Sequence, residues 1–376
     1  MTAPAPTPVE AWVHRGPGDT PRREPLQLGV LRPDELRVRL AACGVCHTDL
    51  FAPRLVPLPA VLGHEGAGVV EEVGSRVATL RPGDRVVLTF GSCGECVNCR
   101  DGAPAYCLRG HELQFGGQRA DGSGTFSGAS AGIHGAFFQQ SSFATHAIAT
   151  ERNAVRIPDA LTFERAAPLG CGVQTGAGAV LNTLACREGS SLAVFGAGSV
   201  GLSAVMAARL AGCARVIAVD VLPQRLALAR ELGATCTLDA REGDVAPRIV
   251  SITGGGVHYS IETAGTEGSF RDAIDCLLGR GVCGLCTVPR LGEPIEFRPL
   301  SILKGRTVTG VLEGSSVPHE FIPRLARLHL EGRLPYDRLI TGYDFADLPR
   351  ALDDAAQGKV VKAVLRMPVA AGQLEM

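Results

Sequence analysis

The chain has 376 residues, 45% of them hydrophobic, 20% charged and 5% aromatic, and its formal net charge is −1. This composition is typical of a packed globular protein, and the length favours two domains. A net charge near zero and few aromatic residues exclude broad surfaces for nucleic acid or an anionic membrane.

The N-terminal stretch MTAPAPTPVEAW lacks the basic and apolar regions of a secretory signal. No later segment predicts a membrane span, because Arg209 and Arg215 interrupt the most apolar helical stretch. The thirteen cysteines are odd in number and include C-x2-C spacings, which favours metal thiolates and free thiols over a secreted disulfide framework. We therefore expect a cytoplasmic protein.

Residues 9–165 predict a β-rich domain, since ELRVRLAACGV, GAGVVEEVG and RPGDRVVLTF have the pattern of short strands between Gly and Pro turns. Residues 116–135 predict a long Gly- and Ser-rich loop, a kind that is usually functional or mobile. From 172 to 308, buried strands such as SLAVF and RVIAV alternate with helical stretches, which predicts a doubly wound α/β domain with a parallel sheet. Two further helices and a final strand, KAVLRM, follow.

The stretch LAVFGAGSVGLSA contains G-x-G-x-x-G between a buried strand and a helix, the context of a Rossmann dinucleotide fingerprint. Its glycines would allow pyrophosphate to approach the helix N-terminus. The turn residues expected at the cofactor are Gly196, Gly198, Ser199, Val200 and Gly201.

Asp220 ends the second strand of this unit, nineteen residues after Gly201. Its carboxylate would accept hydrogen bonds from the adenosine ribose and repel a 2′-phosphate, which favours NAD over NADP. Arg225 would flank the adenine end of the cofactor, or it is a solvated helix residue. The alternative for the whole stretch is a glycine-rich turn without a ligand.

Four cysteines within fifteen residues, in the spacing C-x2-C-x2-C-x7-C, predict a closed tetrahedral zinc site with a structural role. Free thiols, an iron–sulfur cluster and a nucleic-acid zinc knuckle are the alternatives. The four residues are Cys93, Cys96, Cys99 and Cys107.

A second group of metal-ligand residues is dispersed along the chain: Cys46 in ACGVCHTD, His64 in GHE, and Cys171 in LGCGVQTG. Together they fit an open zinc site with two thiolates, one imidazole and a position for water or substrate. Taken singly, each also fits a buried structural residue.

These motifs resemble the zinc-dependent medium-chain alcohol dehydrogenases, whose order they follow from CGVCHTD through GHEGAGVVEEVG, CGECVNCRDGAPAYC, LGCGVQTG and GAGSVG to GKVVKAVL. The resemblance covers nearly the whole chain. It implies a GroES-like catalytic domain of residues 1–171 and 309–376, and a Rossmann NAD-binding domain of residues 172–308. It also implies one catalytic and one structural zinc per chain.

The resemblance implies roles for individual residues near the catalytic zinc. Asp49 would orient the ligand His64, Glu65 would lie behind the metal and assist ligand exchange, and Thr48 would accept the alcohol proton. The resemblance places cationic groups near the cofactor pyrophosphate at His47 and Lys362. Both could instead be solvated.

One position departs from the family. Many members have a histidine three residues after Thr48 as the outlet of a proton relay, and this chain has Phe51 there. A relay from Thr48 would therefore end at another group, such as His47 or water. Phe51 could also be a core residue.

The stretches GCGVQTGAGAVLN and FFQQSSFATHAIA resemble the aryl- and allyl-alcohol dehydrogenase branch. The resemblance implies a homo-oligomeric enzyme, a dimer or a tetramer, that interconverts a primary alcohol and its aldehyde with NAD. A thiol-adduct formaldehyde dehydrogenase and a non-catalytic zinc-stapled scaffold are the alternatives. The remaining cysteines are expected to be core thiols, namely Cys43, Cys186, Cys213, Cys236 and Cys276, or buried strand residues, namely Cys283 and Cys286.

Overall fold

The computed structural model describes residues 6–287, 294–296 and 298–368. These residues form two compact units. Unit 1 runs to Cys171 and includes Val317–Leu330 and the chain from Asp337 onwards; unit 2 comprises Gly172–Ser316 and Glu331–Tyr336. Unit 2 thus extends past the expected boundary at residue 308, because the strand Thr307–Gly310 pairs within its sheet.

Unit 1 is β-rich. A seven-stranded sheet has the order β15-β16-β3-β5-β6-β8, with β7 paired to β3, and a three-stranded sheet has the order β2-β1-β4. The strands are β1 (Thr7–His14), β2 (Arg22–Leu28), β3 (Glu35–Gly44), β4 (Ala60–Val61), β5 (Glu65–Val73), β6 (Arg85–Leu88), β7 (His146–Thr150), β8 (Ala154–Arg156), β15 (Ile340–Asp344) and β16 (Lys362–Arg366).

Strand β3 shows why these residues form a sheet with one buried face. Leu36, Val38 and Leu40 are buried in the core, whereas the intervening Arg37 and Arg39 are only partly buried. This alternation with a period of two residues is the signature of a strand that covers a core on one side. The antiparallel pairing of β3 with β5 also aligns the start of β5 with the end of β3, where the candidate site lies.

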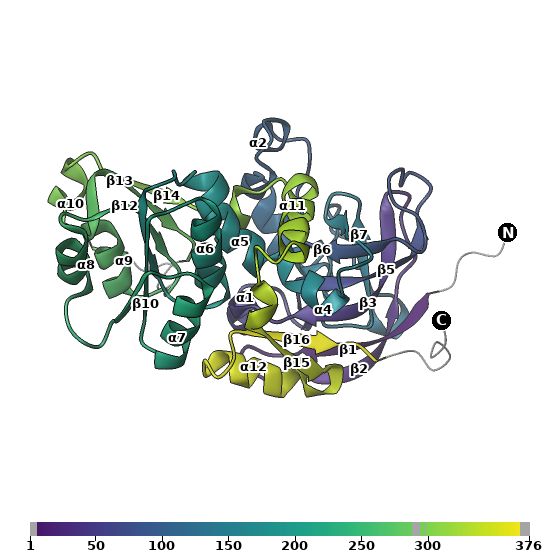
Figure 1. Ribbon diagram of the computed structural model, residues 1–376. Helices are drawn as coiled ribbons and strands as arrows, with labels where there is room; N and C mark the ends of the chain where they lie inside the picture. The colour runs from purple at the N-terminus through teal and green to yellow at the C-terminus, as the bar shows by residue number, and fades with distance from the viewer. Residues whose placement is uncertain (1–5, 288–293, 297, 369–376) are drawn as a thin grey trace. The chain divides into compact units, whose positions relative to one another are not determined.

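The helices of unit 1 are short, except for two near the C-terminus. Helix α12 packs against β16 (Figure 1). These helices are α1 (His47–Phe51), α2 (Val97–Arg100), α3 (Gly110–Phe115), α4 (Phe163–Ala166), α11 (Pro318–Leu330) and α12 (Leu348–Ala356).

Unit 2 contains a six-stranded parallel sheet in the order β11-β10-β9-β12-β13-β14. Its strands are β9 (Ser191–Phe195), β10 (Arg215–Asp220), β11 (Cys236–Asp239), β12 (Val257–Glu262), β13 (Leu277–Leu285) and β14 (Thr307–Gly310). Its helices are α5 (Gly172–Gly178), α6 (Ser199–Leu210), α7 (Pro223–Leu232), α8 (Val245–Thr253), α9 (Glu267–Asp275) and α10 (Leu300–Leu303).

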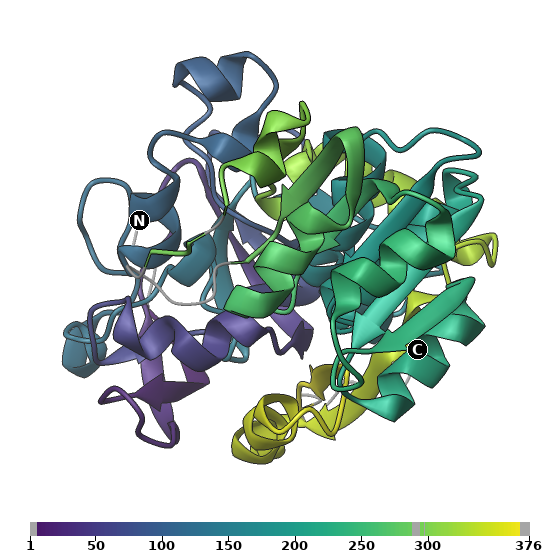
Figure 2. The ribbon, with the colours of Figure 1, turned by 90° about the vertical axis from the view of Figure 1, so that its left-hand side faces the viewer.

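Helices cover both faces of this sheet. Helices α8 and α9 pack against each other on one side of the strands and α6 packs on the other, as Figure 1 shows. Figure 2 turns the α8–α9 side towards the viewer. A parallel sheet with helices on both faces is the doubly wound arrangement, so the predicted fold class is confirmed. Within the described part of the chain, no helix combines the length and the apolar character needed to cross a bilayer.

Candidate active site

The turn after β9 has the geometry that its glycines predict. Gly196 has φ +92°, a conformation that favours glycine. A Cβ on Gly201 would lie 1.8 Å from the Gly196 carbonyl oxygen, so only glycine allows α6 to start this close to the strand. The turn therefore brings backbone N–H groups to the N-terminus of α6, the arrangement that binds phosphate groups.

Asp220, the last residue of β10, is buried and ties the neighbouring loops together. Its carboxylate accepts hydrogen bonds from the backbone N–H groups of Ala197 (2.7 Å), Val221 (2.8 Å) and Leu222 (2.9 Å). A carboxylate offers about four acceptor sites, so one is left for a ribose hydroxyl. Arg225 lies two residues into α7 and is partly buried. That Asp220 and Arg225 contact a cofactor remains a prediction.

The four clustered cysteines of unit 1 do converge. Their sulfur atoms lie within 4.8 Å of one another, and the Sγ atoms of Cys93 and Cys99 are 3.9 Å apart. Zn–S bonds of about 2.3 Å in a tetrahedron separate the sulfurs by about 3.8 Å. Hydrogen bonds from backbone N–H groups, of which that of Leu108 has the largest effect, lower the pKa of the Cys96 thiol to about 6. Cys107 completes a donor set that fits zinc.

The dispersed ligands also come together within unit 1. One ligand atom each from Cys46, His64, Glu65 and Cys171 lies within 4.8 Å of the others, and the sulfurs of Cys46 and Cys171 are 4.0 Å apart. Cys46 precedes α1, His64 precedes β5, and Cys171 follows the short helix 167–170. The pKa of the Cys46 thiol lies well below its usual range, mainly because of its hydrogen bond with Cys171 and secondly because of its interaction with His64. A thiolate at this position is the form that binds metal.

The imidazole of His64 is oriented for a metal. Its Nδ1 lies 2.9 Å from Asp49 Oδ1, and Asp49 Oδ2 accepts a hydrogen bond from the Cys46 N–H. The Nε2 atom of His64 is buried without a hydrogen-bond partner in the described residues. A buried polar atom normally has a partner, so this nitrogen points to a bound ion. The predicted zinc ligands therefore fit a zinc ion.

Lys362 forms a buried ion pair with Glu65. Its Nζ lies 2.7 and 2.9 Å from the two Glu65 carboxylate oxygens and donates a third hydrogen bond to the Val45 carbonyl oxygen. Burial alone would lower the pKa of Lys362, but the Glu65 carboxylate reverses this effect and raises it. The three N–H groups of the ammonium are thus used inside the protein. A contact of Lys362 with pyrophosphate stays a prediction.

Helix α1 carries the residues expected to move the proton. The Thr48 hydroxyl oxygen lies 3.8 Å from the Cys46 sulfur. His47 is exposed, and its ring contacts that of Phe51 with the centroids 6.0 Å apart. Phe51 is partly buried beside His47. The roles of Thr48 and His47 in a proton relay remain predictions.

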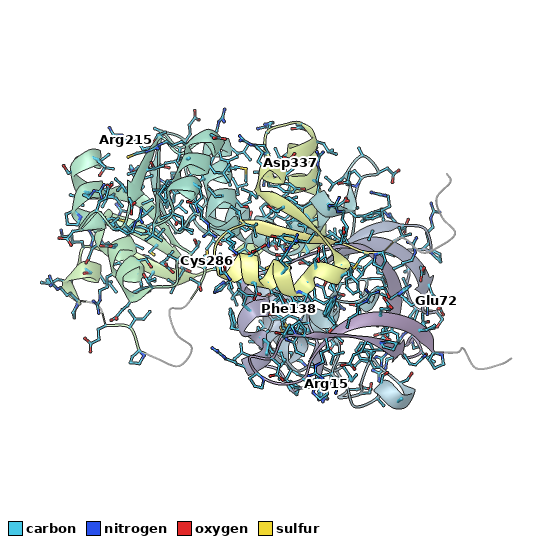
Figure 3. All side chains as sticks on the ribbon, turned by 90° about the horizontal axis from the view of Figure 1, so that it is seen from below. Arg15, Glu72, Phe138, Arg215, Cys286 and Asp337 are labelled. Atoms are coloured by element: carbon cyan, nitrogen blue, oxygen red, sulfur yellow. The ribbon has the colours of Figure 1, made fainter. Side chains whose placement is uncertain are left out.

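Phenylalanine rings flank His64, a feature that the sequence did not predict. The Phe138 ring stacks on the His64 imidazole with centroids 4.4 Å apart, and the Phe137 ring meets it edge-on at 5.5 Å. Figure 3 shows Phe138 inside unit 1, away from Arg15 and Glu72 at its margin. The FF dipeptide was the only sequence signal, and nothing in its spacing pointed to His64.

The remaining cysteines behave differently from one another. Cys43 and Cys276 are buried, as expected. The expectation of core thiols is wrong for Cys186 and Cys213, which lie in loops before β9 and β10, whereas Cys236 begins the edge strand β11 and packs against the core of unit 2. These three are partly exposed. Cys283 is buried in β13, Cys286 follows it partly exposed, and neither belongs to a metal-ligand group of the described residues.

Known proteins are similar to most of this chain. Residues 32–159 match the model of the alcohol dehydrogenase GroES-like domain, and residues 199–329 match that of the zinc-binding dehydrogenases. The chain is 46% identical over 362 residues to a geraniol dehydrogenase from Castellaniella defragrans, covering 95% of this chain and 97% of that protein.

Two solved structures are similar over almost the whole chain. An alcohol dehydrogenase zinc-binding domain protein from Burkholderia ambifaria has a TM-score of 0.94 and 50% identity, covering 97% of this chain and 100% of that one. A benzyl alcohol dehydrogenase from Acinetobacter calcoaceticus has a TM-score of 0.93 and 38% identity, covering 96% and 100%.

Proposed function

This chain belongs to the family of zinc-binding alcohol dehydrogenases, and we propose that it interconverts a primary aryl or allylic alcohol and its aldehyde with NAD. The predicted family and enzyme class, an alcohol dehydrogenase that uses zinc and a nicotinamide cofactor, are confirmed. The observation that carries the proposal is the convergence of Cys46, His64 and Cys171 around the unpartnered Nε2 of His64.

The catalytic site is proposed to hold zinc on these three side chains, with Glu65 behind them. Zinc bound there would act as a Lewis acid that lowers the pKa of a coordinated alcohol. Asp49 keeps the Nδ1 proton of His64 in place, so that Nε2 offers its lone pair. Two thiolates and a neutral imidazole balance the charge of Zn²⁺, which avoids a strongly positive site that would trap the alkoxide. The four cysteines 93–107 would hold the second, structural zinc.

Thr48 is proposed to take the alcohol proton. Its hydroxyl lies beside the Cys46 sulfur and is therefore within reach of a group bound at the metal. Phe51 has no group that could carry the proton further, so the proton would leave through His47 or water.

The cofactor is proposed to bind in unit 2. The turn Gly196–Gly201 would bind the pyrophosphate. The Asp220 carboxylate would accept a hydrogen bond from a ribose hydroxyl and repel the 2′-phosphate of NADP. The nicotinamide supplies the hydride chemistry when bound. His47 and Arg225 are proposed as further cofactor contacts, whereas Lys362 uses its three N–H groups on Glu65 and Val45 and is proposed to act on the zinc site through its pair with Glu65.

The substrate class rests on the two relatives named above and on the aromatic flank of His64. Both the geraniol and the benzyl alcohol dehydrogenase match nearly the whole chain. Rings such as those of Phe137 and Phe138 favour contact with the flat, unsaturated carbons of allylic and aryl alcohols.

A substrate panel on zinc-quantified protein tests the proposal. It compares geraniol, cinnamyl alcohol and benzyl alcohol with ethanol, each with NAD and NADP, and formaldehyde with and without glutathione. We expect kcat/KM with NAD for the unsaturated alcohols to exceed that for ethanol about 100-fold. Turnover only of formaldehyde with glutathione would favour the thiol-adduct reaction, and NADH binding without any turnover would favour a scaffold.

The chain is also proposed to be a homo-oligomer, a dimer or a tetramer. Strand β14 ends the sheet of unit 2, and the exposed Leu300, Leu303 and Leu312 lie on either side of it in sequence. An open strand edge with exposed leucines favours pairing with a second copy. Light scattering after size-exclusion chromatography tests this state. A cytoplasmic location is proposed because none of the thirteen cysteines forms a disulfide in the described structure, which suits a reducing compartment.

A further inference from the structure

The segment 136–141 of unit 1 has an unusual backbone beside the candidate zinc site. Non-glycine residues with left-handed φ angles are strained and persist only where their surroundings hold them. The four such residues here are Ala136 (φ 62°), Phe138 (φ 51°), Gln139 (φ 58°) and Ser141 (φ 53°). The contacts that hold this segment in its strained conformation therefore also lie where they can hold the candidate zinc site.

Gln140 lies in this segment with 2% of its surface exposed, and its carboxamide is fully hydrogen-bonded. Its Nε2 donates to the His64 carbonyl oxygen (2.8 Å) and to the Thr89 carbonyl oxygen (3.0 Å). Its Oε1 accepts from the Gly66 N–H (3.1 Å) and from the Ser142 hydroxyl (2.6 Å). Two donors and two acceptor positions are the full capacity of a glutamine amide. The backbone of His64 is thus fixed by a side chain 76 residues away.

Thr89 continues the network to a second zinc ligand. Its buried hydroxyl donates to the carbonyl oxygen of Gly170, 2.7 Å away, and Gly170 directly precedes Cys171. Gly170 is also packed tightly, because a Cβ on it would lie 2.2 Å from the Leu88 carbonyl oxygen. Hydrogen bonds therefore run from the His64 backbone through Gln140 and Thr89 to the residue before Cys171.

We propose that Gln140 and Thr89 are positioning residues that fix the spacing between His64 and Cys171 in the catalytic zinc site. The inference rests on the proposed function. Asp49 contacts the imidazole ring of His64 and the Cys46 backbone, whereas Gln140 and Thr89 hold the carbonyl groups of His64 and of Gly170, the residue before Cys171. Hydrogen-bond partners of metal ligands change metal affinity about 10- to 100-fold when they are lost.

The test is the rate at which purified, folded protein releases zinc to a colorimetric chelator. Gln140→Met keeps the side-chain length but loses all four hydrogen bonds, and Thr89→Val loses only the hydroxyl. Both variants should release one of two zinc equivalents about 10- to 100-fold faster than wild type, with the second equivalent unchanged. Thr89→Ser should restore slow release.

Gln139→Met is the matched control. Gln139 is the adjacent glutamine of the same segment, but its amide donates to the Leu113 and Gln118 carbonyl oxygens instead. The variant Gln139→Met should leave the rate of zinc release from the catalytic site unchanged. If Gln140→Met does not fold, Thr89→Val carries the test alone.

Two results would overturn the inference. Wild-type release rates in Thr89→Val and Gln140→Met, with two equivalents bound, would overturn the role of Gln140 and Thr89 alone. A wild-type protein that binds only the zinc of the four cysteines would overturn the proposed function, and this inference with it.

Discussion

Gly44 lies opposite Glu65 in the pairing of β3 with β5, and a Cβ on it would come 2.0 Å from Glu65 Oε2. Gly44→Ala should therefore displace the Glu65 carboxylate from Lys362 and lower the free energy of unfolding by about 1–3 kcal/mol. Urea denaturation measures this change. Gly132→Ala is the control, because nothing lies within 4 Å of its added Cβ. Equal stability of the two variants would contradict the steric argument.

The buried pair of Lys362 and Glu65 makes a second prediction for single residues. Lys362→Met leaves the Glu65 carboxylate buried without its cation and should destabilise the protein by about 3–5 kcal/mol. The double variant Glu65→Gln with Lys362→Met removes both charges and should be more stable than the single variant. Denaturation of all three proteins checks this order. A double variant that is less stable than Lys362→Met would show that the two side chains do not act as a pair.

At the scale of elements, we expect the residue at the end of β10 to determine the preference for NAD over NADP. Asp220→Ser removes the charge facing a 2′-phosphate and should raise the ratio of kcat/KM with NADP to that with NAD at least about 10-fold. Steady-state kinetics with both cofactors measure the ratio. Asp239→Ser is the control, since Asp239 ends the neighbouring strand β11 and pairs with Arg241. An unchanged ratio in Asp220→Ser would contradict the assignment.

The loops before β9 and β10 meet at the amino-terminal ends of these parallel strands, where Ala214 N–H donates to the Ser190 carbonyl oxygen. There the hydrogen bond with Cys186 lowers the pKa of Cys213 to about 6. Cys213 should therefore be a thiolate above this pH, and its alkylation by iodoacetamide should reach half its maximal rate near pH 6. Peptide mapping across a pH series measures the rate.

Cys186→Ala, which leaves no hydrogen-bond donor on that side chain, serves as the control for this thiol. It removes the partner thiol and should move the midpoint of Cys213 alkylation towards the ordinary thiol value of about 8.5. A wild-type midpoint already at that value would contradict the interaction.

For the molecule as a whole, much of the site followed from local patterns. The strand before Gly196, the helix after it and Asp220, nineteen residues after Gly201, lie in one continuous stretch of the chain, so their geometry could be predicted from spacing. The four cysteines 93–107 are likewise contiguous. Cys46, His64 and Cys171 lie far apart in the sequence, so their grouping was predicted from their side-chain chemistry and from the order of the motifs, and the structure brings them together.

The rest depends on contacts between distant residues that no spacing encodes. Lys362 meets Glu65 across 297 residues, and Gln140 reaches His64 across 76. The extent of unit 2 also lay outside local patterns, because β14 joins its sheet only through pairing with β13. Such pairings follow from burial and hydrogen bonding in the folded chain.

Turnover of geraniol with NAD by the variant His64→Ala tests the central claim most directly, provided that circular dichroism shows the variant to be folded. The imidazole is one of three proposed zinc ligands, so kcat/KM should fall about 1000-fold or more, or about 4 kcal/mol in transition-state stabilisation. Wild-type turnover by folded His64→Ala would contradict the assignment of the active site to Cys46, His64 and Cys171.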